Sequence, residues 1–392
     1  MCDTLCVVGP RSTIFAKNSD RPVAEIQLIE GWPERAPGDE LRTQYLGIPD
    51  PGAGAVLGAR PDWLWGFEHG VNAAGVAMGN EKLVTTRDSE AGRPALIGMD
   101  LVRLCLERAT SADDALVELA ALVERYGQGG IADRVVGASY FSSFLIAGRG
   151  HGWVVETVGS SWWAAPVDRA AAISNRISLR SEQVTQHSPD LPHGFDPQEF
   201  IDPGYLIARA DRRLACTLPA LPSVGAPADA VSVLRHHGAR PWGRPGSIEV
   251  ELPPPDYDPV TAEGMTVCMH LRGETTTTSA MVAELPHDPA EPPRAWVATH
   301  SPCVAVFVPV FPEFPTPGFL GSAAWWRRFE RLRLRVEADG DALTPIRAVT
   351  GPLEGDLWSE ADDAIRRGPD AIQAYLASVE PRLDRALASL GV

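Results

Sequence analysis

The residues with the clearest capacity for chemistry stand at the start of the chain, in MCDTLCVV. Loss of Met1, which a small neighbouring side chain favours, would leave Cys2 with a thiol and a free α-amino group on one residue. A free cysteine has a pKa of about 8.5 and an α-amine one of about 7.7–8.0, so the amine can take the thiol proton near neutral pH. Cys2 is therefore a candidate nucleophile that carries its own base.

A nucleophile of this kind needs an anchor for its amine and a donor for the oxyanion. The stretch FAKNSDRP follows the first predicted strand, and a hairpin return would bring Lys17 and Asp20 back beside Cys2. Asp20 is the candidate anchor. Because the amine can act as the base, no separate histidine is required, and none of the nine histidines stands in an obvious triad motif.

A metal site is the main chemical alternative. Cys268 and His270 would lie on one face of a strand, and His300 and Cys303 follow some thirty residues later, so a Cys₂His₂ set is conceivable. Its spacing is atypical of zinc-binding motifs. We therefore expect no metal site and no cofactor.

Composition excludes several classes of function. The 392 residues are 44% hydrophobic and 22% charged, as in ordinary globular proteins, and no apolar run reaches the roughly 18 residues of a membrane span. The net charge of −16 and the lack of a basic block disfavour nucleic acid. No phosphate-binding glycine motif appears. Without a secretory signal, and with six scattered cysteines, a cytoplasmic location with reduced thiols is expected.

The order of predicted elements is mixed. Short β-favouring runs at 4–8, 13–16 and 26–29 predict a sheet, and 97–108 predicts a helix. Ser111 with Asp114 predicts the start of a second helix. The chain continues with further predicted strands and with helical patterns at 207–237 and 322–390. Long loops, which are candidate lids, are expected at 181–206 and 238–259. This pattern predicts an α+β fold, with a catalytic domain at 1–320 and a helical extension at 321–392 packed on it.

Several motifs occur together in a characteristic order: MCDTL, FAKNSDRP, WGFEHGVNAAGVAMGNEKL, GMDLVRLCLERATSADDAL, and MTVCMH with TTSAM. In this the chain resembles the secernin and C69 dipeptidase family over most of residues 2–310. That family belongs to the N-terminal nucleophile (Ntn) hydrolases. The resemblance implies a four-layer αββα sandwich, in which two antiparallel sheets lie between helical layers.

The resemblance also implies site residues. Cys2 is similar to the nucleophile, Asp20 to the acidic residue that orients its amine, and Asn80 to the oxyanion-hole asparagine of related amidases. Asn175 resembles their second asparagine, and Lys17 stands where those amidases have an arginine, which offers a different hydrogen-bonding geometry. Each asparagine also ends a β run, where asparagine is common for its tolerance of turns.

Substrate-binding candidates come from two further stretches. Trp65 and Glu68 fall in the family's W-x-W-G-x-E pattern, where an aromatic ring serves as core or as pocket wall. Arg209, Arg212 and Arg213 lie at i, i+3 and i+4 of a predicted helix, where they could hold a substrate carboxylate or form a solvated face.

Together these residues predict a cytoplasmic cysteine Ntn amidohydrolase that cleaves a C–N bond of a small peptide or acyl-amide through a Cys2 thioester. Its partner would be that small-molecule substrate, with no nucleic acid, membrane or cofactor, and a homo-oligomer is compatible with the sequence. Two alternatives stay open. An acyltransferase would resolve the thioester with an amine, and a secernin-like regulatory protein would not be catalytic.

Overall fold

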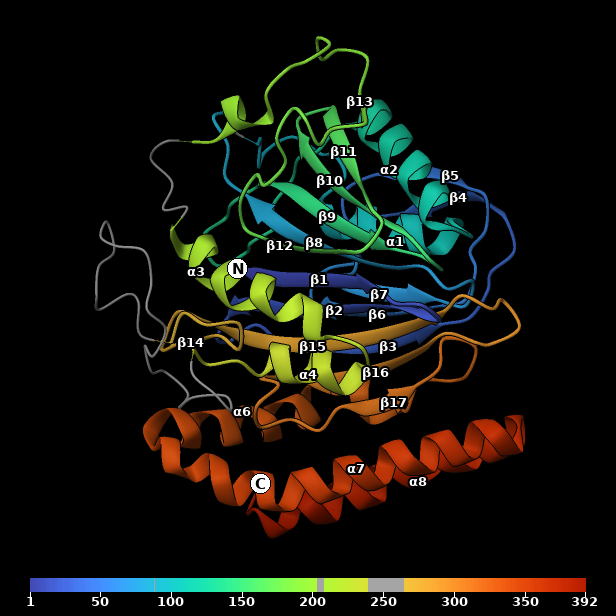
Figure 1. The fold of residues 1–392 in the computed structure, drawn as a ribbon, viewed down its shortest axis with the longest axis vertical. Coiled ribbons are helices and arrows are strands. Elements are labelled where there is room, and N and C mark those ends of the chain that lie inside the picture. Colours follow the sequence, from blue (N-terminus) through green and yellow to red (C-terminus); the bar gives the residue numbers. More distant parts are fainter. Residues whose placement is uncertain (88, 203–207, 239–263) are drawn as a thin grey trace.

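Two stacked antiparallel sheets form the centre of the protein in the computed structural model, which describes residues 1–87, 89–202, 208–238 and 264–392 (Figure 1). The first sheet has the order β12-β1-β2-β15-β16-β17, with β14 paired to β15. Its strands are β1 (Cys2–Val8), β2 (Ser12–Pro22), β12 (Ala170–Ser174), β14 (His270–Leu271), β15 (Thr275–Pro286), β16 (Arg294–Thr299) and β17 (Val308–Val310).

The second sheet has the order β13-β11-β10-β9-β8-β7-β6-β3. Its strands are β3 (Gln27–Trp32), β6 (Val56–Pro61), β7 (His69–Asn72), β8 (Ala77–Leu83), β9 (Phe141–Ala147), β10 (Gly152–Val158), β11 (Ser161–Val167) and β13 (Gln186–His187). A separate hairpin joins β4 (Gly38–Arg42) to β5 (Gly47–Asp50). The two sheets meet where Thr4 of β1 donates a hydrogen bond to Glu81 of β8.

Helices cover the outer faces of both sheets. On the second sheet lie α1 (Gly98–Arg108) and α2 (Ala112–Tyr126), and on the first lie α3 (Ala208–Ala220) and α4 (Pro227–Leu234). The C-terminal helices α6 (Ala323–Ala338), α7 (Leu343–Arg367) and α8 (Pro369–Ser389) lie beyond the β16–β17 edge of the first sheet (Figure 1). The predicted αββα layering is confirmed.

Local sequence explains these elements well. The start of α2 is fixed because the Ser111 side chain accepts from the Asp114 N–H, as its spacing predicted. The predicted helix at 207–237 is instead two helices, because Pro219 and Pro222 remove backbone donors and Gly225 follows them. Within the described residues, no helix is both long enough and apolar enough to cross a membrane.

Two predictions on organisation stay untested. One is the domain boundary between residues 320 and 321. The C-terminal helices do pack on the first sheet, since the Trp296 ring of β16 lies 5.1 Å from the Trp358 ring of α7. The lids are the other: 239–259 and 203–206 lie outside the described residues, and the rest of 181–206 includes β13 and a short 3₁₀ turn at Pro197–Phe200.

The strands that matter for the site are β1, β2 and β15, which are neighbours. Cys2 pairs with Ser19 and Thr4 pairs with Lys17 across the first hairpin. Asp20, near the end of β2, pairs with Thr277 of β15, far away in the sequence. This register brings the first residues of the chain and the KNSD stretch to one end of the sheet.

Candidate active site

The backbone of Cys2 is held on both sides. Its N–H donates to Asn175 Oδ1 at 2.7 Å, and its carbonyl accepts from Ser174 Oγ at 3.2 Å and from an Arg213 guanidinium nitrogen at 2.8 Å. The residue is only 5% exposed. Position 2 is therefore a fixed point of the fold rather than a frayed terminus.

Lys17 lies between the two sheets with no exposed surface. Its ammonium donates to the Asn80 carbonyl at 2.7 Å and to Glu81 Oε1 at 3.2 Å. Gly79 makes room for it, because a Cβ there would lie 2.4 Å from Lys17 Cδ. Burial raises the pKa of the Cys2 thiol, and the positive charge of Lys17 opposes that rise.

Asp20 is tied to three groups. Its Oδ1 accepts from Thr277 Oγ1 at 2.7 Å, its Oδ2 lies 3.8 Å from Arg213, and its carbonyl accepts from the terminal ammonium of Met1 at 3.0 Å. Burial raises the pKa of Asp20 to about 7, against the pull of the terminal ammonium and Arg213. Asp20 thus lies beside the chain terminus, as an anchor for an amine requires.

Arg213, one of the three arginines suggested as substrate ligands, instead binds the backbone of Cys2. It comes from α3, is fully buried, and bridges Asp3 and Asn175 Oδ1, each at 2.8 Å, in addition to the Cys2 carbonyl. The arginine spacing in the sequence predicted that this helix face contributes to the site, but it did not show which arginine contacts Cys2. A buried arginine with three fixed acceptors holds the first residues of β1 in place.

In front of Cys2 lies a cavity of about 260 Å³. Its lining consists of Met1, Cys2, Asp20, Arg21, Pro22, Glu68, Lys82, Asp133, Val136, Tyr140, Asn175, Arg209, Glu274 and Thr275. Two larger hollows, of about 830 and 860 Å³, lie elsewhere, lined neither by Cys2 nor by the groups that bond to it.

The cavity wall carries charges of both signs. The guanidinium of Arg21 already has several partners: it binds Glu25 at 2.6 Å, Glu68 at 3.2 Å and Tyr140 Oη at 3.1 Å. Across the described part of the chain, neither Lys82 nor Arg209 has a carboxylate within ion-pair distance. Lys17 and Lys82 are also the only lysines in the sequence, and both lie at this site.

The other predicted site residues do not all line the cavity. Asn80 stands behind the wall: its Nδ2 donates to Ser142 Oγ at 3.3 Å, and both it and the Tyr140 hydroxyl reach Met99 Sδ at 3.6 Å. Its role in an oxyanion hole stays a prediction.

Trp65 and Arg212, predicted to bind substrate, do not line the cavity. Trp65 stacks instead on the Arg103 guanidinium of α1, 4.2 Å from the ring centre, because its indole faces the helix layer. Arg212 is buried one position before Arg213, so the helix turns the two side chains apart. Glu68 and Arg209 do line the cavity.

The fold and the sequence similarity indicate the same class of protein. Two antiparallel sheets between helical layers, with a cysteine opening an inner strand, form the arrangement that the resemblance to Ntn hydrolases implied. The chain is 27% identical over 205 residues to two proteins named "Probable dipeptidase A" from Streptococcus pyogenes, serotypes M3 and M1. The predicted resemblance to C69 dipeptidases is confirmed at this level.

The extent of these similarities is limited. Each match covers 50% of this chain and 40% or 39% of the relative's length, so the chain matches about two fifths of these curated proteins. No protein-family model matches. Among solved structures, penicillin V acylase from Agrobacterium tumefaciens is similar with 13% identity, a TM-score of 0.43 and coverage of 76% of this chain and 83% of that one.

Conjugated bile acid hydrolase from Clostridium perfringens is similar with 14% identity and a TM-score of 0.40, over 76% of this chain and 89% of that one.

Proposed function

We propose that the chain is a cysteine Ntn amidohydrolase that cleaves the C–N bond of a short peptide, in the manner of a dipeptidase. The observation that carries this proposal is the setting of Cys2. Its backbone nitrogen is bound by Asn175, Cys2 lines a cavity, and Asp20 lies beside the chain terminus. Removal of Met1 would turn that bound nitrogen into a free amine.

The reaction follows from these groups. The Cys2 amine takes the thiol proton, and the thiolate attacks the substrate carbonyl carbon to form a tetrahedral oxyanion. The resulting ammonium returns the proton to the leaving nitrogen as the C–N bond breaks, which leaves a thioester on Cys2. Water, deprotonated by the same amine, attacks the thioester and releases the acid, and the thiol is restored.

Lys17 and Arg213 act on this chemistry without touching substrate. The charge of Lys17 favours the thiolate form of the buried Cys2. Arg213 holds the Cys2 carbonyl and the Asn175 oxygen together, so the nitrogen that serves as base keeps a fixed position. For the oxyanion, the proposed donor is Asn80 Nδ2, which would have to leave its long bond to Ser142 and move into the cavity from behind its wall.

The cavity favours a zwitterionic substrate. Its volume is about 260 Å³ with Met1 in its lining, so the removal of Met1 that the proposal requires would enlarge it. Lys82 and Arg209 are available for a carboxylate, and Glu274 for an ammonium group, while Glu68 already pairs with Arg21. A dipeptide carries both charges at its two ends, and the curated relatives are named dipeptidases.

The test compares two cysteines of one strand. Cys2→Ala should abolish hydrolysis of a dipeptide panel, whereas Cys6→Ala, at a buried position four residues along β1, should keep it. Active protein should have an intact mass that begins at Cys2, and N-acetylated dipeptides should be poorer substrates. Turnover by Cys2→Ala, or by protein that retains Met1, would contradict the proposal.

Products formed with an added amine acceptor would separate hydrolysis from acyl transfer. A cytoplasmic location and self-association stay predictions.

A further inference from the structure

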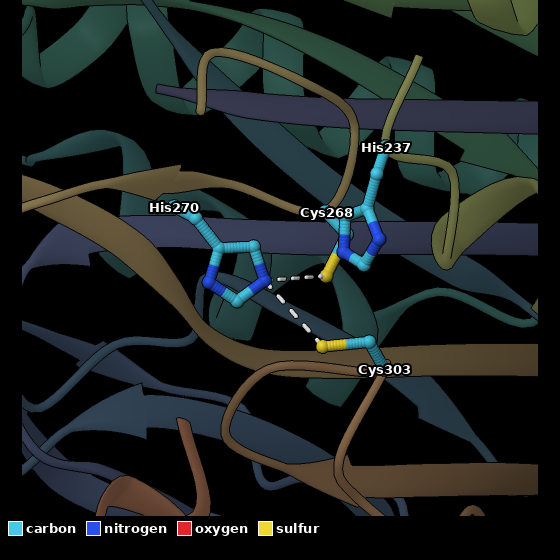
Figure 2. Close-up of side chains that lie close together, drawn as sticks. All are labelled: His237, Cys268, His270 and Cys303. Atoms are coloured by element: carbon cyan, nitrogen blue, oxygen red, sulfur yellow. Dashed lines mark hydrogen bonds between the residues drawn. The ribbon is translucent and has the colours of Figure 1, made fainter. Parts of the chain in front are cut away.

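A second cluster of reactive side chains is separate from the lining of the cavity. Figure 2 shows His237, Cys268, His270 and Cys303 pointing toward one another. All four are fully buried, and their ligand atoms lie within 4.8 Å of one another. His270 Nε2 is 3.4 Å from the sulfur of Cys268 and 3.4 Å from that of Cys303.

This set differs from the one that the sequence suggested. His300 does not join it: its backbone has φ of 76°, its Nδ1 accepts from the Ser301 N–H at 2.8 Å, and its ring lies 4.4 Å from that of Trp326. His237, which follows α4, takes that place.

We propose that His237, Cys268, His270 and Cys303 form a structural zinc site. Two thiolates and two imidazoles are a ligand set that Zn²⁺ prefers. With Zn–S bonds of about 2.3 Å and Zn–N bonds of about 2.05 Å, a tetrahedral site has S···N edges of ~3.6 Å. Both measured S···N distances of His270 are close to that edge.

The surroundings fit a metal-bound histidine. His270 Nδ1 lies 3.0 Å from Glu337 Oε1, which fixes the ring so that Nε2 faces the two sulfurs. Arg333 in turn holds Glu337 at 2.6 Å. A carboxylate behind a ligating imidazole is the usual support of a zinc site. Two thiolates would also neutralise the cation, which suits a fully buried site.

The backbone is shaped for this convergence. Gly264, with φ of 82°, lets the chain pass close to His270, where a Cβ would lie 2.1 Å from the His270 carbonyl oxygen. The His270 N–H donates back to the Gly264 carbonyl at 2.8 Å, and the Cys268 N–H donates to the His236 carbonyl at 3.0 Å. The second bond ties the segment after α4 to the segment before β15.

The zinc site would have no open coordination position, so it would affect catalysis only by holding neighbouring residues in place. Four protein ligands fill a tetrahedral zinc, so no position is left for substrate. Met269, between two of the ligands, donates its N–H to Thr277 Oγ1 at 2.9 Å, and Thr277 donates to Asp20 at 2.7 Å. Zinc would thus hold in place the segment that orients Asp20. This inference does not depend on the proposed reaction.

The test measures metal in the whole chain. Protein purified under reducing conditions and reconstituted with Zn²⁺ should hold about one zinc per chain by elemental analysis. Cys268→Ser and Cys303→Ser should each lose most of it, whereas Cys105→Ser, the same change at an equally buried cysteine outside the cluster, should keep it. Removing zinc should lower the thermal midpoint of the wild type and of Cys105→Ser.

A second measurement needs no variant that folds. Wild-type protein loaded with Co²⁺ should show the intense ligand-field bands of a tetrahedral site and thiolate-to-metal charge transfer. Three outcomes would overturn the inference: wild type that takes up no zinc after reconstitution, a folded Cys268→Ser/Cys303→Ser double variant that keeps about one equivalent, or a Cys268–Cys303 disulfide in reduced preparations.

Discussion

The ion pair between Lys17 and Glu81 offers the sharpest test of the site's construction. Both side chains are fully buried, and the ammonium has two partners, the Asn80 carbonyl and Glu81 Oε1. Lys17→Met keeps most of the unbranched side chain, one atom shorter, but leaves a carboxylate buried without its cation. Breaking a buried pair in this way costs about 3–5 kcal/mol. Because Thr4 still donates to Glu81, we expect the lower end, about 3 kcal/mol.

The assay is urea unfolding followed by tryptophan fluorescence. The double variant Lys17→Met/Glu81→Gln should lose less than the sum of the single variants, with a coupling energy of roughly 1–3 kcal/mol. Lys82→Met is the matched control, since the other lysine is half-buried and pairs with no carboxylate in the described part of the chain; it should change stability by about 0.5 kcal/mol or less.

A second readout is the rate at which Cys2 is alkylated, measured by peptide mass spectrometry. The charge of Lys17 opposes the rise in the pKa of Cys2, so its loss raises that pKa further and alkylation becomes slower. If Lys17→Met unfolds with the wild-type free energy, and Cys2 reacts at the wild-type rate, the pair has neither role and the reasoning is wrong.

Three further changes test other parts of the site. Asn80→Ala should lower kcat by about 10²–10³-fold with little change in folding, and a wild-type kcat would leave Asn80 only a packing role. The folded pKa of Asp20, about 7, exceeds its ordinary 3.8, so its contribution to stability is present below pH 3.8 and is lost as pH rises through 7. The unfolding free energy of wild type relative to Asp20→Asn should therefore fall over that interval, and a flat difference would contradict the raised pKa. Gly79→Ala should cost about 1–3 kcal/mol by crowding Lys17, whereas Gly355→Ala, with open space around it, should be neutral or stabilising.

Local patterns predicted much of the fold. The helix at 97–108 and the cap at Ser111 are set by residues within a few positions of one another, so the sequence shows them directly. The pairing of β2 with β15 is different. It joins segments more than 250 residues apart, and no local signal specifies which strands become neighbours.

The site shows the same division. Cys2, Lys17 and Asp20 come from one hairpin, and its register could be inferred from the sequence. Arg213 could not be singled out, because it shares a helix face with Arg209 and only the packing of α3 on β1 decides which guanidinium reaches Cys2. His237 was missed in the metal-ligand set for a similar reason, since α4 brings it to the cluster from a distant segment.

The scarcity of lysine has a practical consequence for labelling. Lys17 is sealed between the sheets, so a reagent that acylates amines would meet only the chain's terminal amine and Lys82. Burial lowers the pKa of Lys82, which leaves more of it as the reactive free base at a given pH. Both groups border the same cavity, so a fluorophore attached through amines would report from its mouth. Coupling to a resin through amines would orient every molecule with that mouth against the support.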